Sequence, residues 1–285
     1  MKFIHISDLH LPTKLPFLKL RGKPFIGYLN YYLRRRKLHP IEVIESIVSF
    51  IKNSEYDCLI ISGDITNISH EKEFIEAKRI LSPVLNEKAF LIPGNHDRYS
   101  LESLSYFEKY FGEFAGDQIP SIPLYAKTKK FKNITLLGLD SNHPTSIANA
   151  SGFIEPETLY KSFNYLKEKQ ISKFAVVCHH PIWNPPDKFE SIYHRMTNRE
   201  EVQSLFLEHP PIAYFHGHAH TNWIKNKSKD MPYSIVNSAS STRLSDARHE
   251  SGFHTGDLSV DTLNLKRFAF SKEKRILEEK NLASS

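Results

Sequence analysis

The stretch Ala89-Phe90-Leu91-Ile92-Pro93-Gly94-Asn95-His96-Asp97 joins a short apolar run to a polar cluster. An apolar run of this length, ended by proline and glycine, is typical of a buried β-strand followed by a loop. The cluster offers an amide, an imidazole and a carboxylate within three positions. We therefore expect a buried strand that leads directly into a loop whose side chains could bind metal ions or take part in catalysis.

Four other apolar runs end in polar clusters in the same way. We expect buried strands at residues 3–6, 58–61, 174–177 and 212–215, in addition to 89–92. The clusters that follow them are Asp8-Leu9-His10, Gly63-Asp64, Cys178-His179-His180-Pro181 and Gly217-His218-Ala219-His220. Because ligands gather in a crevice at the carboxyl ends of the strands of an open α/β sheet, clusters far apart in sequence are expected to meet there.

The side chains of these clusters suit a pair of transition-metal ions. Neutral imidazoles combined with carboxylates favour Mn, Fe, Co, Ni or Zn, whereas an all-oxygen shell would suggest Mg or Ca. Two ions about 4 Å apart must share a ligand, and a carboxylate can bridge them where an imidazole cannot. Asp64 is the candidate bridge.

The order Asp-x-His, Gly-Asp, Gly-Asn-His-Asp, His-His-Pro and Gly-His-x-His resembles that of the calcineurin-like metallophosphoesterases. The resemblance runs from Asp8 to His220. One such cluster alone could be an ordinary turn, since aspartate and asparagine are common there, but five in order are specific. By this resemblance one ion is bound by Asp8, His10 and His220, the other by Asn95, His179 and His218, and Asp64 bridges both.

The resemblance also implies the reaction and the fold. His96 corresponds to the catalytic histidine that protonates the leaving oxygen, with Asp97 to orient it, while a hydroxide that bridges the metals attacks phosphorus. His180 is expected behind the ligands, because adjacent residues on an extended segment point in opposite directions.

The segment Gly138-Leu139-Asp140-Ser141 resembles the phosphodiesterase branch. The leading interpretation is a dinuclear phosphodiesterase. A lipid-directed enzyme acting on a substrate like UDP-diacylglucosamine, a nuclease and a non-catalytic scaffold are the alternatives.

The rest of the chain predicts one α/β domain. Helical patterns cover residues 41–52, 71–81, 101–111, 157–169 and 200–208, and further strands are expected at 233–237 and 258–270. Alternating strands and helices followed by strands agree with the four-layer αββα sandwich of two mixed sheets that the resemblance implies. We expect a single domain over residues 1–270 and a polar tail over 271–285.

A basic and aromatic segment at residues 11–40 interrupts this pattern. It has no acidic residue, and eight of the chain's 38 basic residues lie between positions 14 and 37, which leaves 30 basic against 32 acidic residues elsewhere. The net charge of +6 therefore belongs to this segment. Ile26, Leu29 and Leu33 share a helical face, and Arg34-Arg35-Arg36-Lys37 follow it. Three interpretations remain open: a packed insertion at the rim of the active site, contact with an anionic lipid surface, or contact with nucleic acid.

Composition indicates a cytoplasmic protein, with a peripheral membrane location as the open alternative. Cys58 and Cys178 lie in apolar runs, which favours buried reduced thiols over a disulfide. No apolar stretch is long enough for a membrane span, and the first cluster follows Met1 too closely for a signal peptide. The sequence predicts no particular oligomeric state, and its motifs leave the choice of substrate to the surrounding loops.

Overall fold

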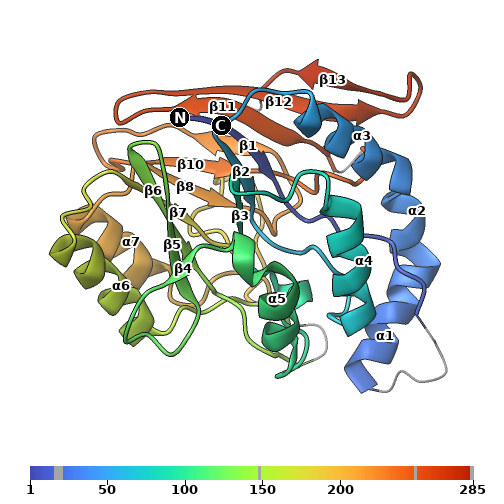
Figure 1. Cartoon of the computed structure of the whole chain (residues 1–285), viewed down its shortest axis with the longest axis horizontal. Coiled ribbons are helices and arrows are strands. Elements are labelled where there is room, and N and C mark those ends of the chain that lie inside the picture. The colour runs from blue at the N-terminus through green and yellow to red at the C-terminus, as the bar shows by residue number, and fades with distance from the viewer. Residues whose placement is uncertain (16–21, 147–148, 247–248, 283–285) are drawn as a thin grey trace.

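The computed structural model describes residues 1–15, 22–146, 149–246 and 249–282. Two β-sheets pack face to face, and helices cover the outer side of each sheet (Figure 1). This arrangement confirms the predicted αββα sandwich. The apolar core between the sheets contains strand residues of both, such as Ile4 and Phe215.

The first sheet has the strand order β13-β12-β11-β1-β2-β3. Strands β1, β2 and β3 run parallel, and β11, β12 and β13 add to β1 as an antiparallel set. The strands are β1 (Lys2–Ile6), β2 (Cys58–Ile61), β3 (Ala89–Leu91), β11 (Phe253–Leu258), β12 (Leu263–Ser271) and β13 (Ile276–Lys280). Three of the predicted cluster-bearing strands therefore end at the same edge.

The second sheet has the order β4-β5-β6-β7-β8-β10-β9. Its centre is parallel from β6 to β10, with antiparallel strands at both sides. The strands are β4 (Asp117–Gln118), β5 (Ala126–Phe131), β6 (Ile134–Leu139), β7 (Phe174–Val177), β8 (Ala213–His216), β9 (Trp223–Lys225) and β10 (Ser234–Asn237). The other two predicted cluster-bearing strands, β7 and β8, are neighbours here.

Helices on the two outer faces explain the strand patterns. The first sheet is covered by α3 (Ile41–Lys52), α4 (Glu71–Leu81) and α5 (Ser103–Phe111), and the second by α6 (Pro156–Glu168) and α7 (Arg199–Glu208). In β7, Ala175 and Val177 face the core between the sheets, whereas Val176 packs toward α6 and α7. Alternate residues of a strand point to opposite faces, so a strand between two apolar layers is apolar throughout.

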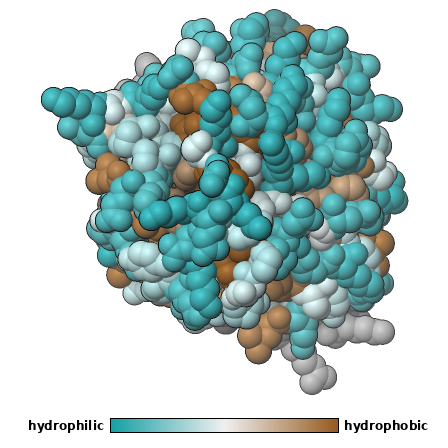
Figure 2. All heavy atoms as spheres, turned by 60° about the vertical axis from the view of Figure 1, so that its left-hand side comes forward, coloured by the Kyte–Doolittle hydropathy of each residue, from teal (hydrophilic) through white to brown (hydrophobic). Residues whose placement is uncertain are grey.

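The outer surface on the side of α6 and α7 is mainly polar, as expected for a face in contact with water (Figure 2). The face that comes forward in Figure 2, on the side of α6 and α7, is mainly hydrophilic, with apolar residues in small separate patches. No helix in the described part of the chain is long and apolar enough to cross a bilayer. Cys58 and Cys178 are buried free thiols, as predicted.

The prediction for the carboxyl-terminal tail was wrong. The run at residues 258–270 contains the end of β11 and most of β12, which the turn between Leu258 and Leu263 separates. The expected polar tail instead contains β13, which pairs with β12. Its charged residues suit an edge strand, which needs little apolar character and avoids edge-to-edge association. Lys266 on β12, for example, pairs with Glu279 on β13 at 2.9 Å.

The segment at residues 11–40 is helical from Gly22 onward. It forms α1 (Gly22–Asn30), a π-helical turn (Tyr31–Arg35) and α2 (Arg36–Leu38), with Tyr28 and Tyr31 buried against the body of the protein. The predicted apolar face is not the packed one, since Ile26 and Leu33 are 47% and 62% exposed. Phe17, Leu18, Lys19, Leu20 and Arg21 lie outside the described residues, as do the side chains of Lys23 and Arg34.

Candidate metal centre

The loops that follow β1, β2, β3, β7 and β8 meet at one edge of the two sheets. Backbone hydrogen bonds continue between these loops beyond the strands: Asp8 N–H donates to the Gly63 carbonyl at 3.0 Å, and His10 N–H to that of Asp64 at 2.9 Å. On the other sheet, Gly217 N–H donates to the His179 carbonyl at 3.2 Å. These bonds join the loops of each sheet, and the His218 N–H, which donates to Asp8 Oδ2 at 2.9 Å, joins the loops of the two sheets.

Three of the predicted ligands form a first group. The Nε2 atom of His220 lies 3.2 Å from Asp8 Oδ1 and 3.3 Å from His10 Nε2. Asp8 and His10 are buried. The Asp8 carboxylate is held in place by the backbone N–H of His218, 2.9 Å from its Oδ2.

Three others form a second group around Asn95. The Asn95 Oδ1 atom lies 3.1 Å from His179 Nε2 and 3.0 Å from His218 Nδ1. These residues come from loops after β3, β7 and β8. The second group thus combines ligands from both sheets.

Asp64 lies between the two groups. Its Oδ2 atom is 3.7 Å from His10 Nε2 in the first group and 3.5 Å from His179 Nε2 in the second. Its Oδ1 atom accepts the backbone N–H of His96 at 2.7 Å, which fixes the orientation of the carboxylate. One carboxylate oxygen therefore faces both groups.

Backbone carbonyls hold the outer nitrogen of three imidazoles. His10 Nδ1 lies 3.2 Å from the Thr66 carbonyl, His179 Nδ1 lies 2.8 Å from that of Ser62, and His218 Nε2 lies 2.8 Å from that of His194. A carbonyl can only accept, so it fixes the proton on that nitrogen and turns the other nitrogen toward the site. Metal-binding histidines have this arrangement almost without exception.

The electrostatics of the site favour neutral His10 and His218, but a protonated His179 beside the ionised Asp64 carboxylate. Burial lowers the pKa of His10 and of His218 well below the usual value. Burial opposes the charge of Asp64, but the neighbouring His179 holds the pKa of that carboxyl well below its usual range. Burial likewise opposes protonation of His179, yet the carboxylates of Asp64 and Asp8 raise the pKa of His179 to about 9. A metal ion would displace this proton.

The backbone at the site is unusual. Five of the seven predicted ligands have a positive φ, between 42° and 66°: Asp8, His10, Asp64, His218 and His220. The left-handed region costs a non-glycine residue about 1–3 kcal/mol, and such residues gather at functional sites because the surroundings hold them there. A sequence pattern does not report this feature.

Gly94 shows how closely the loops approach. A Cβ atom at this position would lie 2.2 Å from Asp64 Oδ1 and 2.3 Å from the Asp64 backbone nitrogen. Only glycine leaves room for the Asp64 carboxylate to reach the middle of the site. Gly94 therefore allows the loop to turn and also leaves the space that the Asp64 carboxylate occupies.

A family model described as calcineurin-like phosphoesterase matches residues 1–222 of the chain. This protein belongs to the calcineurin-like phosphoesterase family. It is accordingly a metal-dependent phosphoester hydrolase, of a family whose members carry a dinuclear divalent metal site.

Individual relatives agree with this membership. A protein named probable cyclic nucleotide phosphodiesterase from Ruthia magnifica subsp. Calyptogena magnifica is 25% identical over 225 residues, which is 77% of this chain and 87% of the relative. Among solved structures, a dimetal phosphatase from Danio rerio has a TM-score of 0.64 at 16% identity and 99% coverage of both chains. The purple acid phosphatase PPD1 from yellow lupin has a TM-score of 0.57 at 12% identity, covering 98% of this chain and 52% of that one. The structural likenesses support the fold.

His96 of this calcineurin-like phosphoesterase lies beside both ligand groups. Its ring is 4.9 Å from that of His10 and stacks on Tyr99 at 5.3 Å. Its Nδ1 lies 2.5 Å from the Asn67 carbonyl, and its Nε2 faces the cavity, where it lies 3.0 Å from Arg35 Nη1. Burial, with the Arg35 guanidinium as the next cause, lowers the pKa of His96 to about 4.

The expectation that Asp97 orients the His96 ring was wrong. The Asp97 carboxylate is buried and accepts the backbone N–H groups of Ile65, Thr66 and Gly94 at 2.8–3.1 Å, together with the Thr66 hydroxyl at 2.8 Å. The ring of His96 is held by Asn67 instead. Asp97 ties the loop after β2 to the loop after β3, so its effect on His96 acts through the backbone.

His180 has the supporting position that was predicted for it. It points away from the ligand groups, with Nδ1 2.7 Å from the Ser141 hydroxyl and Nε2 2.9 Å from the Ala150 carbonyl. Its ring lies 4.3 Å from that of His218. The segment at residues 138–141 thus supports a predicted ligand from behind.

Sequence reasoning missed the individual residues that complete the cavity over the site. The cavity has a volume of about 550 Å³ and is lined by Asp64, Asn95, His96, His218 and His220. Its other walls come from the insertion and from loops, among them Asn30, Arg35, Tyr99, Asn149, His194 and His249. The absence of acidic residues between Asp8 and Glu42 was the signal that could have pointed to Arg35.

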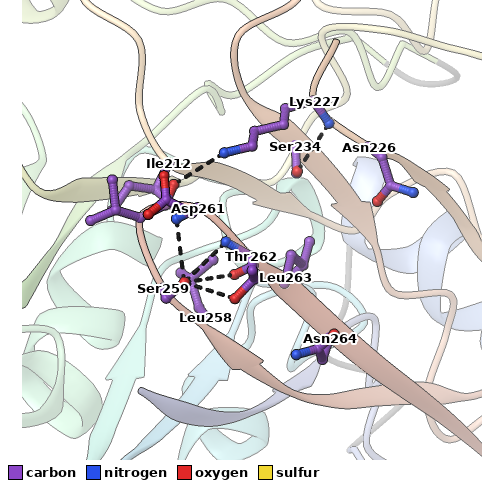
Figure 3. A pocket seen from close by; sticks show the side chains of 11 residues that line it. Ile212, Asn226, Lys227, Ser234, Leu258, Ser259, Asp261, Thr262, Leu263 and Asn264 are labelled. Atoms are coloured by element: carbon purple, nitrogen blue, oxygen red, sulfur yellow. Dashed lines mark hydrogen bonds between the residues drawn. The ribbon is translucent and has the colours of Figure 1, made fainter.

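A second hollow lies away from this edge of the sheets. It has a volume of about 290 Å³ and is lined by residues from the β11–β12 turn and from the amino-terminal ends of β8 and β10 (Figure 3). Several of its polar atoms are engaged with each other: the Ser259 hydroxyl contacts the Thr262 hydroxyl at 2.8 Å and accepts from the Thr262 N–H at 3.0 Å. This hollow holds no cluster of titratable groups, and its hydrogen bonds serve the turn.

Proposed function

We propose that this protein is a phosphodiesterase that hydrolyses a P–O bond with the help of two divalent transition-metal ions. The observation that carries this proposal is the position of Asp64 Oδ2, which lies within 3.7 Å of an imidazole nitrogen in each ligand group. The proposed ligands are Asp8, His10 and His220 for one ion and Asn95, His179 and His218 for the other, with Asp64 shared.

The donor set fits such a pair. Four imidazoles, two carboxylates and one amide oxygen suit Mn, Fe, Co, Ni and Zn, all of which accept mixed nitrogen and oxygen ligands. When bound, two ions about 4 Å apart lower the pKa of water and neutralise charge on the phosphoryl group. The carbonyls behind His10, His179 and His218 would orient these ligands.

His96 is proposed as the general acid. Because its Nδ1 proton is engaged with Asn67, Nε2 is the ring atom that would hold the proton for the leaving oxygen, and this role requires that the bound phosphoryl anion raise the pKa of His96 above the value of about 4. Its ring position next to His10 and Tyr99 would keep that atom at the mouth of the site.

The preference for a diester rests on two supports. Both curated relatives, from Ruthia magnifica and Vesicomyosocius okutanii, carry the name probable cyclic nucleotide phosphodiesterase. The segment at residues 138–141 is also similar to the phosphodiesterase branch, and here it contacts His180 behind His218.

Turnover by Mn²⁺-, Fe²⁺- and Zn²⁺-reconstituted protein tests the proposal. We expect hydrolysis of bis-p-nitrophenyl phosphate and of at least one cyclic nucleotide, with p-nitrophenyl phosphate a poorer substrate. Faster hydrolysis of the monoester than of every diester would contradict the phosphodiesterase assignment and leave a phosphomonoesterase.

A lipid-directed phosphodiesterase or pyrophosphatase is the second candidate, because the insertion exposes apolar and basic groups together. Ile26, Tyr32 and Leu33 are 47%, 50% and 62% exposed, and the Arg36 guanidinium lies 4.8 Å from the Tyr32 ring centre. Apolar and aromatic side chains beside cations suit an anionic membrane surface. Ile26 also lines the cavity over the site, so a bound bilayer would lie next to it.

Vesicle binding separates the two candidates. We expect the wild-type protein to sediment with phosphatidylglycerol vesicles if the lipid candidate holds, and the triple variant Ile26→Ser, Tyr32→Ser, Leu33→Ser to lose this binding. Leu207→Ser on α7, at a site 55% exposed, is the matched control. A wild-type protein that stays in the supernatant, or a triple variant that sediments equally well, would exclude the lipid candidate.

A further inference from the structure

Arg35 extends from the insertion into the cavity over the metal centre. Its Nη1 atom lies 3.0 Å from His96 Nε2, and the residue lines the same cavity as Asp64, Asn95 and His218. It is the last residue of the π-helical turn. Turns of this type widen a helix and are frequent at functional sites.

The backbone that carries Arg35 is fixed on both sides. On the carboxyl side, His39 N–H donates to the Arg35 carbonyl at 3.0 Å, and Leu244 N–H donates to the Leu38 carbonyl at 2.8 Å. His39 Nδ1 also lies 2.8 Å from the Thr242 hydroxyl. On the amino side, the buried Tyr31 packs with Tyr28 and Leu15. The guanidinium is therefore presented by a segment that is anchored to the body of the protein.

Arg35 forms no ion pair with a carboxylate in the described part of the chain, and the polar contacts of its guanidinium there are with the ring of His96. A guanidinium carries five N–H donors and no acceptor, so most of its donors remain available. Its planar fork matches the oxygens of a phosphate, which it can bind through two parallel hydrogen bonds.

We propose that Arg35 binds a non-bridging oxygen of the substrate's phosphoryl group. This inference rests on the proposed function for the identity of the substrate, and it deepens that function by naming a phosphate-binding residue. An anionic phosphoryl group draws the guanidinium away from His96 Nε2, which leaves that nitrogen facing the leaving oxygen. The insertion then supplies a functional side chain as well as a wall of the site.

Orthophosphate binding to the Mn²⁺-loaded protein tests this assignment without turnover. Isothermal titration calorimetry should show that Arg35→Gln weakens orthophosphate binding by about 10- to 100-fold, the range for losing hydrogen bonds to a charged group. Arg35→Lys should recover part of the affinity, because it keeps the charge but loses the fork. Arg36→Gln, one residue away and exposed, is the matched control and should bind as the wild type does.

Turnover on bis-p-nitrophenyl phosphate gives the second measurement. Arg35→Gln should lower kcat/KM by about the factor lost in phosphate affinity, with metal content unchanged by elemental analysis. Wild-type orthophosphate affinity and wild-type KM in Arg35→Gln would overturn the proposal, and a loss confined to kcat would make Arg35 a positioning residue for His96. If no diester is hydrolysed but orthophosphate binding still depends on Arg35, the substrate assignment fails and the Arg35 assignment stands.

Discussion

At the scale of single residues, His96 has a backbone role that is separate from its ring. Its backbone N–H holds Asp64 Oδ1 at 2.7 Å, whereas its ring contacts Asn67, Tyr99 and Arg35. Replacing the side chain alone therefore leaves the support of Asp64 in place. This separation makes the proposed acid role testable.

His96→Ala should lower turnover by about 10²-fold or more while two metal ions remain bound. The loss should shrink on esters with a nitrophenolate leaving group, because such a group departs without a proton. Steady-state kinetics on a series of diesters with leaving groups of increasing pKa measures this dependence. An equal loss on good and poor leaving groups would argue for simple phosphate positioning.

Asp97→Asn should act on stability, because Asp97 joins two loops through four donors. An amide offers one acceptor oxygen, and its NH₂ group would face backbone N–H groups. We expect the free energy of unfolding to fall by about 2 kcal/mol in urea titrations, in line with the cost of an unsatisfied buried donor. Unchanged stability combined with a large loss of turnover would contradict this structural role and indicate that Asp97 acts on the chemistry of His96.

The convergence of the proposed ligand residues could be predicted from the sequence because their chemical types and their places after apolar runs are local features. The role of Asp97 could not, since a carboxylate next to a histidine in sequence need not face its ring. The left-handed backbone of Asp8, Asp64 and His218 was equally hidden, because it arises from contacts between loops of different strands. Arg35 required knowledge of where the insertion packs.

At the scale of elements, the strongly periodic segments were predicted well. Helices α3 and α4 have the predicted bounds, and α5, α6 and α7 begin or end within two residues of them. The strand β13 was missed because an edge strand is stabilised by its partner and carries charges that look like a tail. The π-helical turn leaves no signature in apolar periodicity.

Gly27 determines how closely α1 approaches the body of the protein. A Cβ atom there would lie 2.8 Å from Ile68 Cγ2 and 3.1 Å from the Tyr99 hydroxyl. Gly27→Val should move α1 outward at a cost of about 1–3 kcal/mol and displace Arg35 from the cavity. We expect kcat/KM to fall toward the value of Arg35→Gln, with metal content unchanged.

Tyr32→Val, on the exposed side of the same segment, is the control for Gly27→Val and should keep wild-type kinetics on a soluble diester. If Gly27→Val is as active as the wild type, activity does not depend on the close packing of α1 against Ile68 and Tyr99. Arg35 would then reach the site from a more loosely held segment.

At the scale of the whole molecule, the two sheets supply different parts of one centre. Asp8, His10, Asp64 and Asn95 follow strands of the first sheet, whereas His179, His218 and His220 follow strands of the second. Each sheet alone would present an incomplete set of the proposed ligands. Packing the sheets face to face therefore brings the proposed ligands together.

The measurement that tests this account most directly is the number of metal ions bound per chain in the wild type and in Asp64→Asn, by elemental analysis after equilibrium dialysis against Mn²⁺. The account predicts two ions in the wild type and at most one in Asp64→Asn, with turnover abolished, because an amide cannot supply the anionic oxygen that faces both groups. Two ions per chain and normal turnover in Asp64→Asn would contradict it.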